Sequence, residues 1–170
     1  MGRAGWIVVV AAAAAVATAA VFGPVSVRPQ RAAVDDAATP LIRTDYSDPG
    51  AWLTVRALIG RPTADGFLAR LEIIDDRAWA GLEPSQAVRR LSPPHGDHAL
   101  VVMADARTMR DPEHTLLCVD PSTLRSVRVI PSELWSIENN LSLANLDWND
   151  FLDAADKDGV LRGFKDAARK

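Results

Sequence analysis

The chain has 170 residues, of which 48% are hydrophobic and 24% are charged, and its formal net charge is −3 at pH 7. This composition is typical of a globular protein rather than a disordered one, and the length suits one domain with residues to spare. A mildly acidic chain without a basic run argues against nucleic acid as a partner.

The first predicted element is an apolar run from Trp6 to Phe22, broken only by Thr18. About 17 residues is at the short end for a helix that spans a bilayer. Arg3 precedes the run, and Ala17-Thr18-Ala19 offers the small-x-small pattern that a signal peptidase cuts. Three interpretations stay open: a membrane anchor, a cleaved signal peptide, or a stretch upstream of the true start, which would leave the protein in the cytoplasm.

The rest of the chain divides by composition. Residues 23–39 are rich in Pro, Ala, Val and Arg and have no helical or strand period, which indicates a linker after the apolar segment 1–22. A single domain is expected over residues 40–164, followed by a polar tail at 165–170.

Within this domain, runs of β-branched and apolar residues alternate at first with helical patterns. Strands are expected at 40–46, 67–75, 98–104, 115–119 and 126–130. Helices are expected at 49–59 and 84–91. The alternation favours a parallel arrangement of the first three strands, and the short connection Asp120-Pro121-Ser122-Thr123 favours a hairpin between the last two. Cys118 lies in an apolar run and is expected in the core.

The segment from Pro131 to Phe151, PSELWSIENNLSLANLDWNDF, carries a second kind of pattern. Its apolar residues recur three or four apart, which predicts one buried stripe of a helix. The stripe comprises Leu134, Ile137, Leu141, Ala144 and Trp148. Ser132 and Asp147 are expected to cap helices on either side of a break near Asn145. The predicted fold is therefore a single α/β domain, with a mixed sheet of about five strands and C-terminal helices.

Four segments, in chain order, carry a resemblance to a known family. They are Leu41-Ile42-Arg43-Thr44-Asp45, the run DRAWAGL at 76–82, the run DPEH at 111–114, and PSELWSIENNLSLANLDWNDF. Together they resemble the bacterial domain-of-unknown-function family numbered 6924, from about residue 40 to Phe164, and the long last motif is the specific part. The resemblance implies a single domain without an established activity, and therefore no catalytic residue. The family domain begins near its LIRTD-like segment, so Met1 to Thr39 departs from the family pattern.

The same 131–151 segment supplies the candidate binding residues. In a helix, an aromatic ring and several amides and acceptors would share the side opposite the apolar stripe, which is typical of a surface that binds another protein. The candidates are Trp135, Glu138, Asn139, Asn140, Ser142 and Asn145. The alternative is that the glutamate and the asparagines satisfy backbone groups where the helix breaks.

Acidic residues also follow the predicted strands, at the edge where open α/β sheets bind ligands. They are Asp45, Asp75, Asp76 and Asp105. Together these carboxylates would suit Mg²⁺, and the alternative is that each caps the turn or helix after it. A zinc site is a weaker interpretation of His95, Asp97, His98 and His114, because the first two histidines lie in a Pro-Gly loop.

No standard catalytic signature is found, and no cofactor is expected. The leading hypothesis is a non-enzymatic binding or regulatory module. The alternatives are a Mg²⁺-dependent enzyme that uses the strand-end aspartates, and a membrane-tethered envelope protein held by the segment Trp6–Phe22.

Overall fold

A mixed sheet of six strands organises the part of the chain that the computed structural model describes, residues 38–91 and 98–164. The strands are β1 (Thr39–Arg43), β2 (Leu71–Ile74), β3 (Val101–Ala104), β4 (Leu116–Val119), β5 (Ser126–Val129) and β6 (Val160–Leu161). Their order across the sheet is β2-β1-β3-β4-β5-β6. Strands β1, β2 and β3 are parallel, β4 is antiparallel to β3 and β5, and β6 runs parallel to β5.

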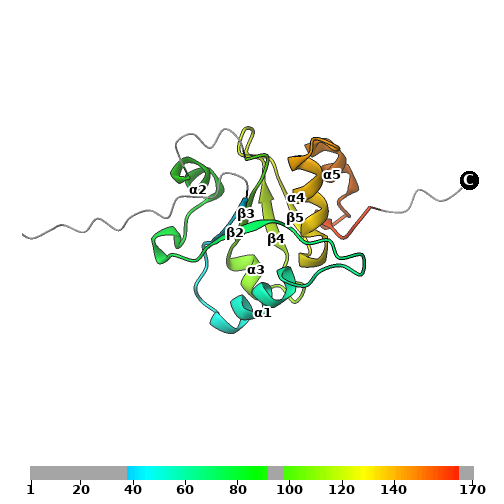
Figure 1. Cartoon of the computed structure of the whole chain (residues 1–170). Coiled ribbons are helices and arrows are strands. Elements are labelled where there is room, and N and C mark those ends of the chain that lie inside the picture. Colours follow the sequence, from blue (N-terminus) through cyan, green and yellow to red (C-terminus); the bar gives the residue numbers. More distant parts are fainter. Residues whose placement is uncertain (1–37, 92–97, 165–170) are drawn as a thin grey trace, which may run out of the picture. The chain divides into compact units, whose positions relative to one another are not determined.

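Helices cover both faces of this sheet (Figure 1). They are α1 (Pro49–Ile59), α2 (Pro84–Arg90), α3 (Ala106–Arg110), α4 (Leu134–Ser142) and α5 (Trp148–Ala154). Two 3₁₀ turns, η1 (Arg77–Trp79) and η3 (Pro131–Glu133), precede α2 and α4. The expected α/β domain is thus confirmed, with its parallel strands, its hairpin β4–β5 and its C-terminal helices.

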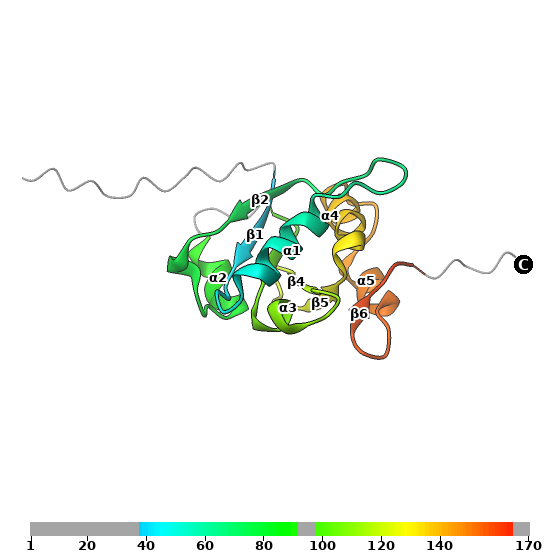
Figure 2. The same ribbon diagram turned by 90° about the horizontal axis from the view of Figure 1, so that it is seen from below.

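The core has two parts because neighbouring side chains of a strand point to opposite faces of the sheet. Leu41 packs with residues of α1, α4 and α5 on one face, and Ile42 packs with Trp79 and residues of α2 on the other. Figure 1 shows α2 on one side of the strands and α4 and α5 on the other, and in Figure 2 α1 lies over the strands. Cys118 is buried as expected, and burial raises the pKa of its thiol.

The prediction for the first helix is confirmed in detail. Asp48 caps α1, since its carboxylate accepts a hydrogen bond from the Ala51 amide at 2.9 Å, and Pro49 fills the first turn. Gly60 follows the last helical residue. The strands are shorter than expected: β1 begins at Thr39 and ends at Arg43, and residues 67–70 belong to no strand and precede β2. Strand β6, of two residues, and helix α3, of five, were not predicted, because segments so short show no period.

The 131–151 segment forms two helices on either side of a break, as expected, but the prediction of one apolar stripe through Ala144 and Trp148 is wrong. Leu134, Ile137 and Leu141 are buried on α4, but Trp148 belongs to α5. Ala144 lies exposed between the two helices with a positive φ of 53°. Asp147 caps α5 as expected, accepting from the Asn149 amide at 2.6 Å. The Ser132 cap is wrong, because η3 occupies this position and α4 begins two residues later. The amides that lower helix propensity end α4 sooner than the apolar spacing suggests.

Candidate functional site

The carboxyl ends of β1, β2 and β3 meet at one edge of the sheet because these strands are parallel, and the four strand-end aspartates lie there. Two of them cap local turns. Asp45 accepts hydrogen bonds from the Ser47 amide, at 3.0 Å, and from the Ser47 hydroxyl. Asp76 accepts from the Ala78 amide at 2.9 Å and so begins η1. Both carboxylates therefore accept hydrogen bonds within their own turns.

Asp75 joins β2 to residues of β1 and α1. Its carboxylate accepts from the Trp52 indole at 2.8 Å and lies 3.4 Å from the Arg43 guanidinium. That guanidinium also lies over the Tyr46 ring, 4.2 Å from its centroid. The Tyr46 hydroxyl is buried and has no hydrogen-bond partner among the described residues. Burial first, and then the charge of Asp75, raise the pKa of Tyr46 to about 12, so the phenol stays neutral at physiological pH.

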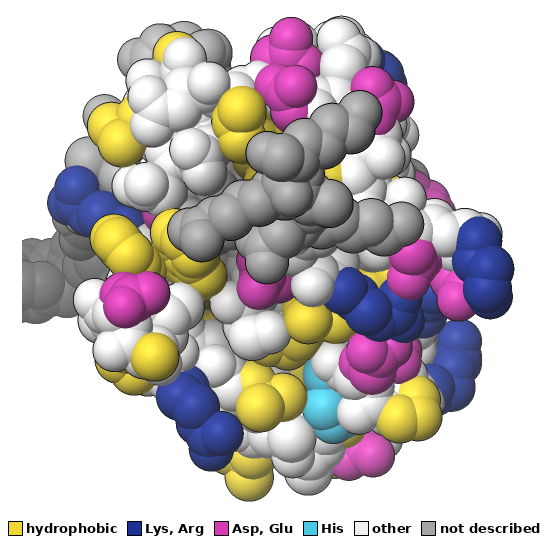
Figure 3. Space-filling model, turned by 90° about the vertical axis from the view of Figure 1, so that its right-hand side faces the viewer, with side chains coloured by type: hydrophobic (Ala, Val, Ile, Leu, Met, Phe, Trp, Pro, Cys, Tyr) yellow, Lys and Arg dark blue, Asp and Glu magenta, His cyan; other side chains and the backbone are white. Residues whose placement is uncertain are grey.

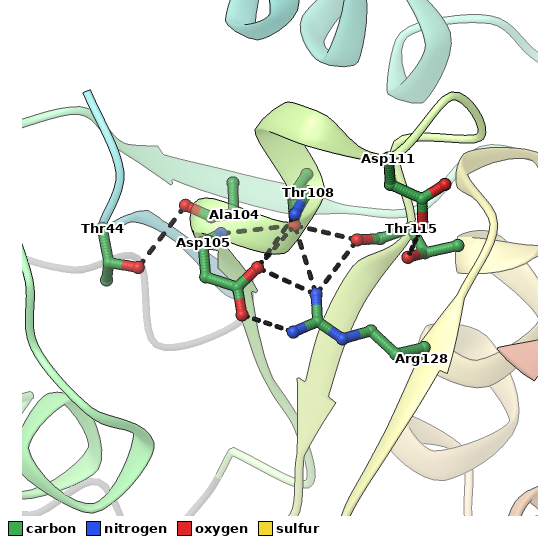
Figure 4. Close-up of polar contacts among 7 residues, drawn as sticks. All are labelled: Thr44, Ala104, Asp105, Thr108, Asp111, Thr115 and Arg128. Atoms are coloured by element: carbon green, nitrogen blue, oxygen red, sulfur yellow. Dashed lines mark hydrogen bonds and ion pairs between the residues drawn. The ribbon is translucent and has the colours of Figure 1, made fainter. Parts of the chain in front are cut away.

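Asp105 is bound by a side chain that arrives from the far side of the hairpin. Arg128 of β5 lies opposite Leu117 of β4, so its side chain stands on the sheet face of Leu117 and crosses β4 to the end of β3. Its two terminal nitrogens meet the two carboxylate oxygens of Asp105, one of them at 2.9 Å, and one nitrogen also donates to the Thr115 carbonyl at 3.2 Å. Figure 4 shows this bidentate pair beneath α3.

The same carboxylate also caps α3. Asp105 accepts from the Thr108 amide at 3.0 Å, and the Thr108 hydroxyl donates to the Thr115 carbonyl at 2.8 Å. Burial by itself would raise the pKa of Asp105, but the bonds from Arg128 and Thr108 outweigh it and leave the pKa below its ordinary value. The Asp105–Arg128 site is thus satisfied from within the fold.

These contacts argue against a magnesium site formed by the strand-end aspartates. In the described part of the chain, no group of three or more Asp, Glu, His or Cys side chains is arranged to hold a metal ion. The strand-end carboxylates bind arginine, tryptophan and backbone groups of their own surroundings instead. Of the zinc candidates, His95 and Asp97 lie outside the described residues, and the His114 ring is 3.0 Å from the Thr108 carbonyl.

A second region presents apolar side chains to solvent. Phe67 stacks on Trp135 with ring centroids 4.7 Å apart and ring planes 12° from parallel. Phe67 is 50% exposed and its neighbour Leu68 is 49% exposed. We call Phe67, Leu68 and Trp135 the aromatic face. Figures 1 and 2 show how it forms: the loop between α1 and β2 extends beside α4.

The loop is built to hold Phe67 in this position. The Phe67 amide donates to the Thr63 hydroxyl, and the Thr63 amide donates to the Phe67 carbonyl, both at 2.9 Å. Gly66 precedes Phe67 with a φ of 84°, a conformation that favours glycine. Hydrogen bonds across the turn therefore fix an exposed aromatic ring, which a freely moving loop would not.

The predicted binding residues fall into different environments. Trp135 and Asn139 are partly exposed on α4, and Ser142 and Asn145 are exposed at its end. The Asn140 amide donates to the Ser136 carbonyl at 2.8 Å within the helix. Glu138 was expected on the exposed side, and this placement is wrong. Its side chain is buried beside the start of β1, because a wider part of α4 packs on the sheet than the apolar spacing indicates.

Glu138 joins three segments of the fold. Its carboxylate accepts from the Arg70 amide at 3.2 Å, from the Thr39 hydroxyl at 3.4 Å and from the Ser142 hydroxyl at 3.3 Å. The carboxylate thus ties α4 to the first residues of β1 and to the residue before β2. This is the backbone-satisfying role that the sequence left open as an alternative.

A wider hollow, of about 410 Å³, opens between α3 and the turn before β6. Arg107, Arg110 and Arg162 contribute three positive charges to its walls, and three acidic residues balance them. Arg162 pairs with Glu113 across the hollow. The walls offer neither a net charge nor a nucleophile with an adjacent base, so they indicate no reaction.

Sequence reasoning missed Phe67, Leu68 and Arg128. The sequence did hold a signal for Phe67 and Leu68. This apolar pair comes directly after Gly66, too early to belong to the strand that follows. The sequence held no signal for the role of Arg128. Alternation along β5 predicts that a polar residue at this position faces solvent, and only the fold shows that Asp105 lies within reach of the Arg128 side chain.

Comparison with known proteins identifies one family. A family model described as "Domain of unknown function (DUF6924)" matches residues 38–164. A search of curated proteins found no significant match. Within residues 38–91 and 98–164, no helix has the length and apolar character that crossing a membrane requires, and the segment Trp6–Phe22 lies outside these ranges.

Proposed function

Because the chain belongs to the DUF6924 family, whose function is unknown, we propose from its own geometry that the domain is a non-enzymatic binding module whose contact surface is centred on the aromatic face. The observation that carries this proposal is the stack of Phe67 on Trp135, two aromatic rings from different segments held together at the surface. Aromatic side chains supply much of the contact energy in binding surfaces at a low cost in side-chain entropy.

The shape of this surface favours a large partner over a small ligand. The hollow beside the stack has a volume of only about 10 Å³, which is room for one water molecule at most. A small molecule would have no cavity to enter there. A broad surface, by contrast, can cover Phe67 and Leu68 together. Asn139 and Ser142, further along α4, supply amide and hydroxyl groups at the rim.

The contacts of the strand-end aspartates also support a non-enzymatic role. Each of them is engaged by its own capping group, arginine or indole, and a Mg²⁺ ion would have to displace these contacts before it could bind. The magnesium-dependent enzyme remains the second hypothesis. Calorimetric titration with Mg²⁺ or Mn²⁺ at millimolar concentrations tests this hypothesis. Heat of binding that is present in the natural chain and disappears in Asp105→Asn would support it.

The proposal is tested by photocrosslinking in cells that express the full chain natively. A benzophenone amino acid replaces Phe67 in one variant and Leu53 in a matched control, because Leu53 is 68% exposed on α1 and does not line the hollow beside Trp135. We expect covalent adducts of defined mass from position 67 and few from position 53. Equal adduct formation at the two positions would show that the aromatic face is ordinary surface.

A further inference from the structure

We infer that the outer edge of β2 pairs with the same edge of a second copy of this chain, so that the two sheets join into one. This inference rests on the proposed function, because Phe67 and Leu68 of the aromatic face directly precede this edge in the chain. Strand β2 lies at one end of the sheet order and pairs with β1. In Figure 2 the run from the loop into β2 follows one border of the domain.

The backbone of this edge offers hydrogen bonds to another strand. Thr39 of β1 lies opposite Leu71, and in a parallel ladder this directs the backbone groups of Glu72 toward β1. The N–H and C=O groups of Leu71 and Ile73 therefore face away from β1. In the described part of the chain, neither these groups nor those of Ala69 have a hydrogen-bond partner. Unpaired backbone groups at a sheet edge are a template for an added strand.

The edge of β2 lacks the features that protect other sheet edges. Strand β6, at the opposite end of the sheet, has only two residues, and very short edge strands resist pairing. The run from Ala69 to Ile73 is longer and contains neither proline nor glycine. An extended polypeptide is thus the partner that the backbone of β2 fits.

Charge shows which polypeptide this partner is. Figure 3 looks onto the side of α4 and α5, where basic and acidic side chains are interspersed and favour no ligand of one sign. The charged residues at β2 instead have a simple order, with Arg70 two positions before Glu72. Such a pair is complementary to itself when a twofold axis reverses the second strand.

The position of the axis follows from these charges. An antiparallel pair with its axis at Leu71 sets Arg70 of each chain opposite Glu72 of the other. Both side chains already have a contact within their own chain, and the second copy adds an opposite charge to each. An axis at Glu72 would instead set two glutamates against each other, which is destabilising. An axis at Ile73 would carry the ladder past Ile74, where β2 ends.

The apolar residues agree with an axis at Leu71. Leu71 meets its own counterpart there, and Ile73 lies opposite Ala69 of the second copy. These are the three residues whose backbone groups are unpaired, so the ladder uses each of them. Ile74 comes opposite Leu68 of the aromatic face. Ile73 is 36% exposed and Leu68 is 49% exposed, so both lose contact with water when the strands pair.

Sedimentation equilibrium of the full chain tests this inference, because it measures the affinity of the monomer for itself. Glu72→Arg is compared with Asp153→Arg, which makes the same change of net charge on an exposed residue of α5. The twofold axis repeats every pair, so we expect Glu72→Arg to weaken dimerisation about tenfold. Asp153→Arg should leave it unchanged. The double variant Arg70→Glu with Glu72→Arg exchanges the charges and should restore the natural affinity.

A second variant tests the backbone of the edge. The Ile73 N–H faces away from β1, so Ile73→Pro keeps the pairing of β2 with β1 and removes a donor from the ladder between the copies. We expect this variant to be monomeric at concentrations at which the natural chain is dimeric. Urea unfolding of each variant checks that the monomer remains folded.

A natural chain that stays monomeric overturns the inference, as does a dimer that Glu72→Arg and Asp153→Arg weaken equally. A double variant that fails to regain affinity overturns the axis at Leu71. The crosslinker at position 67 then separates this failure from that of the proposed function. We expect adducts of twice the chain mass. If position 67 captures a different protein instead, the proposed function stands and the second copy was the wrong partner. If it captures nothing beyond the level of position 53, the proposed function fails as well.

Discussion

The Asp105–Arg128 site and the aromatic face are opposite in how they use their side chains. At the first, every strong polar group faces another one: the bidentate pair, the cap of α3 and the Thr115 carbonyl. At the second, rings that could be buried stay in contact with water while the loop that carries Phe67 is held by its own hydrogen bonds. Polar groups satisfied internally stabilise a fold, whereas exposed apolar area gains free energy only when something covers it.

The largest effect should come from breaking the satisfied site. Arg128→Met leaves the Asp105 carboxylate partly buried beside α3 without its strongest partner, and we expect a loss of about 3 kcal/mol in the free energy of unfolding. Urea denaturation measures it. Arg125→Met is the control, because Arg125 is an exposed arginine of the same hairpin and should cost less than about 1 kcal/mol. Equal losses would mean that the bidentate pair contributes nothing special.

A smaller loss is expected where α4 is joined to the sheet. Glu138→Ala removes the acceptor of the Arg70 amide and of the Thr39 hydroxyl, which should cost about 2 kcal/mol in thermal or urea unfolding. Asn139→Ala, one position along α4, changes a side chain for which no hydrogen bond is found in the described part of the chain. It should stay within about 0.5 kcal/mol. A reversed order of these two variants would contradict the buried role of Glu138.

The pH dependence of stability gives a finer comparison. The pKa of Asp105 is lower in the folded protein than its ordinary value, so the folded state holds this proton less tightly than the unfolded state. The stabilisation is present above about pH 4, the unfolded value, and is lost as pH falls through the lower folded pKa. Asp105→Asn should therefore flatten the decline of unfolding free energy below about pH 4. If the unfolding free energies of the two proteins fall equally as the pH is lowered, Asp105 does not contribute to the loss of stability in acid.

The smallest effect on stability should accompany the largest effect on binding. Phe67→Ser and Leu68→Ser remove area that is already half exposed, so each should change the free energy of unfolding by less than about 1 kcal/mol. Leu53→Ser is the control for both measurements. A severe loss of stability in Phe67→Ser would indicate that the stack on Trp135 serves the fold, and the contrast between the two regions would disappear.

The sequence by itself determined the α/β class, the first helix with its cap, the parallel strands and the hairpin, because each depends on residues near one another in the chain. Asp48 beside Pro49 begins a helix wherever it occurs, and alternation marks a strand locally. The family resemblance seen in the sequence agrees with the family model that matches residues 38–164.

Only the tertiary structure decided which candidate residues are used internally. In the sequence, Glu138 and Asp105 cannot be told apart from acidic residues that face solvent. Their partners Thr39 and Arg128 lie 99 and 23 residues away, respectively. The aromatic face likewise joins Phe67 to Trp135, which lie 68 residues apart in the chain (135 − 67). Local patterns report what a side chain can do, but whether it is buried, paired or exposed depends on neighbours that the fold brings from elsewhere in the chain.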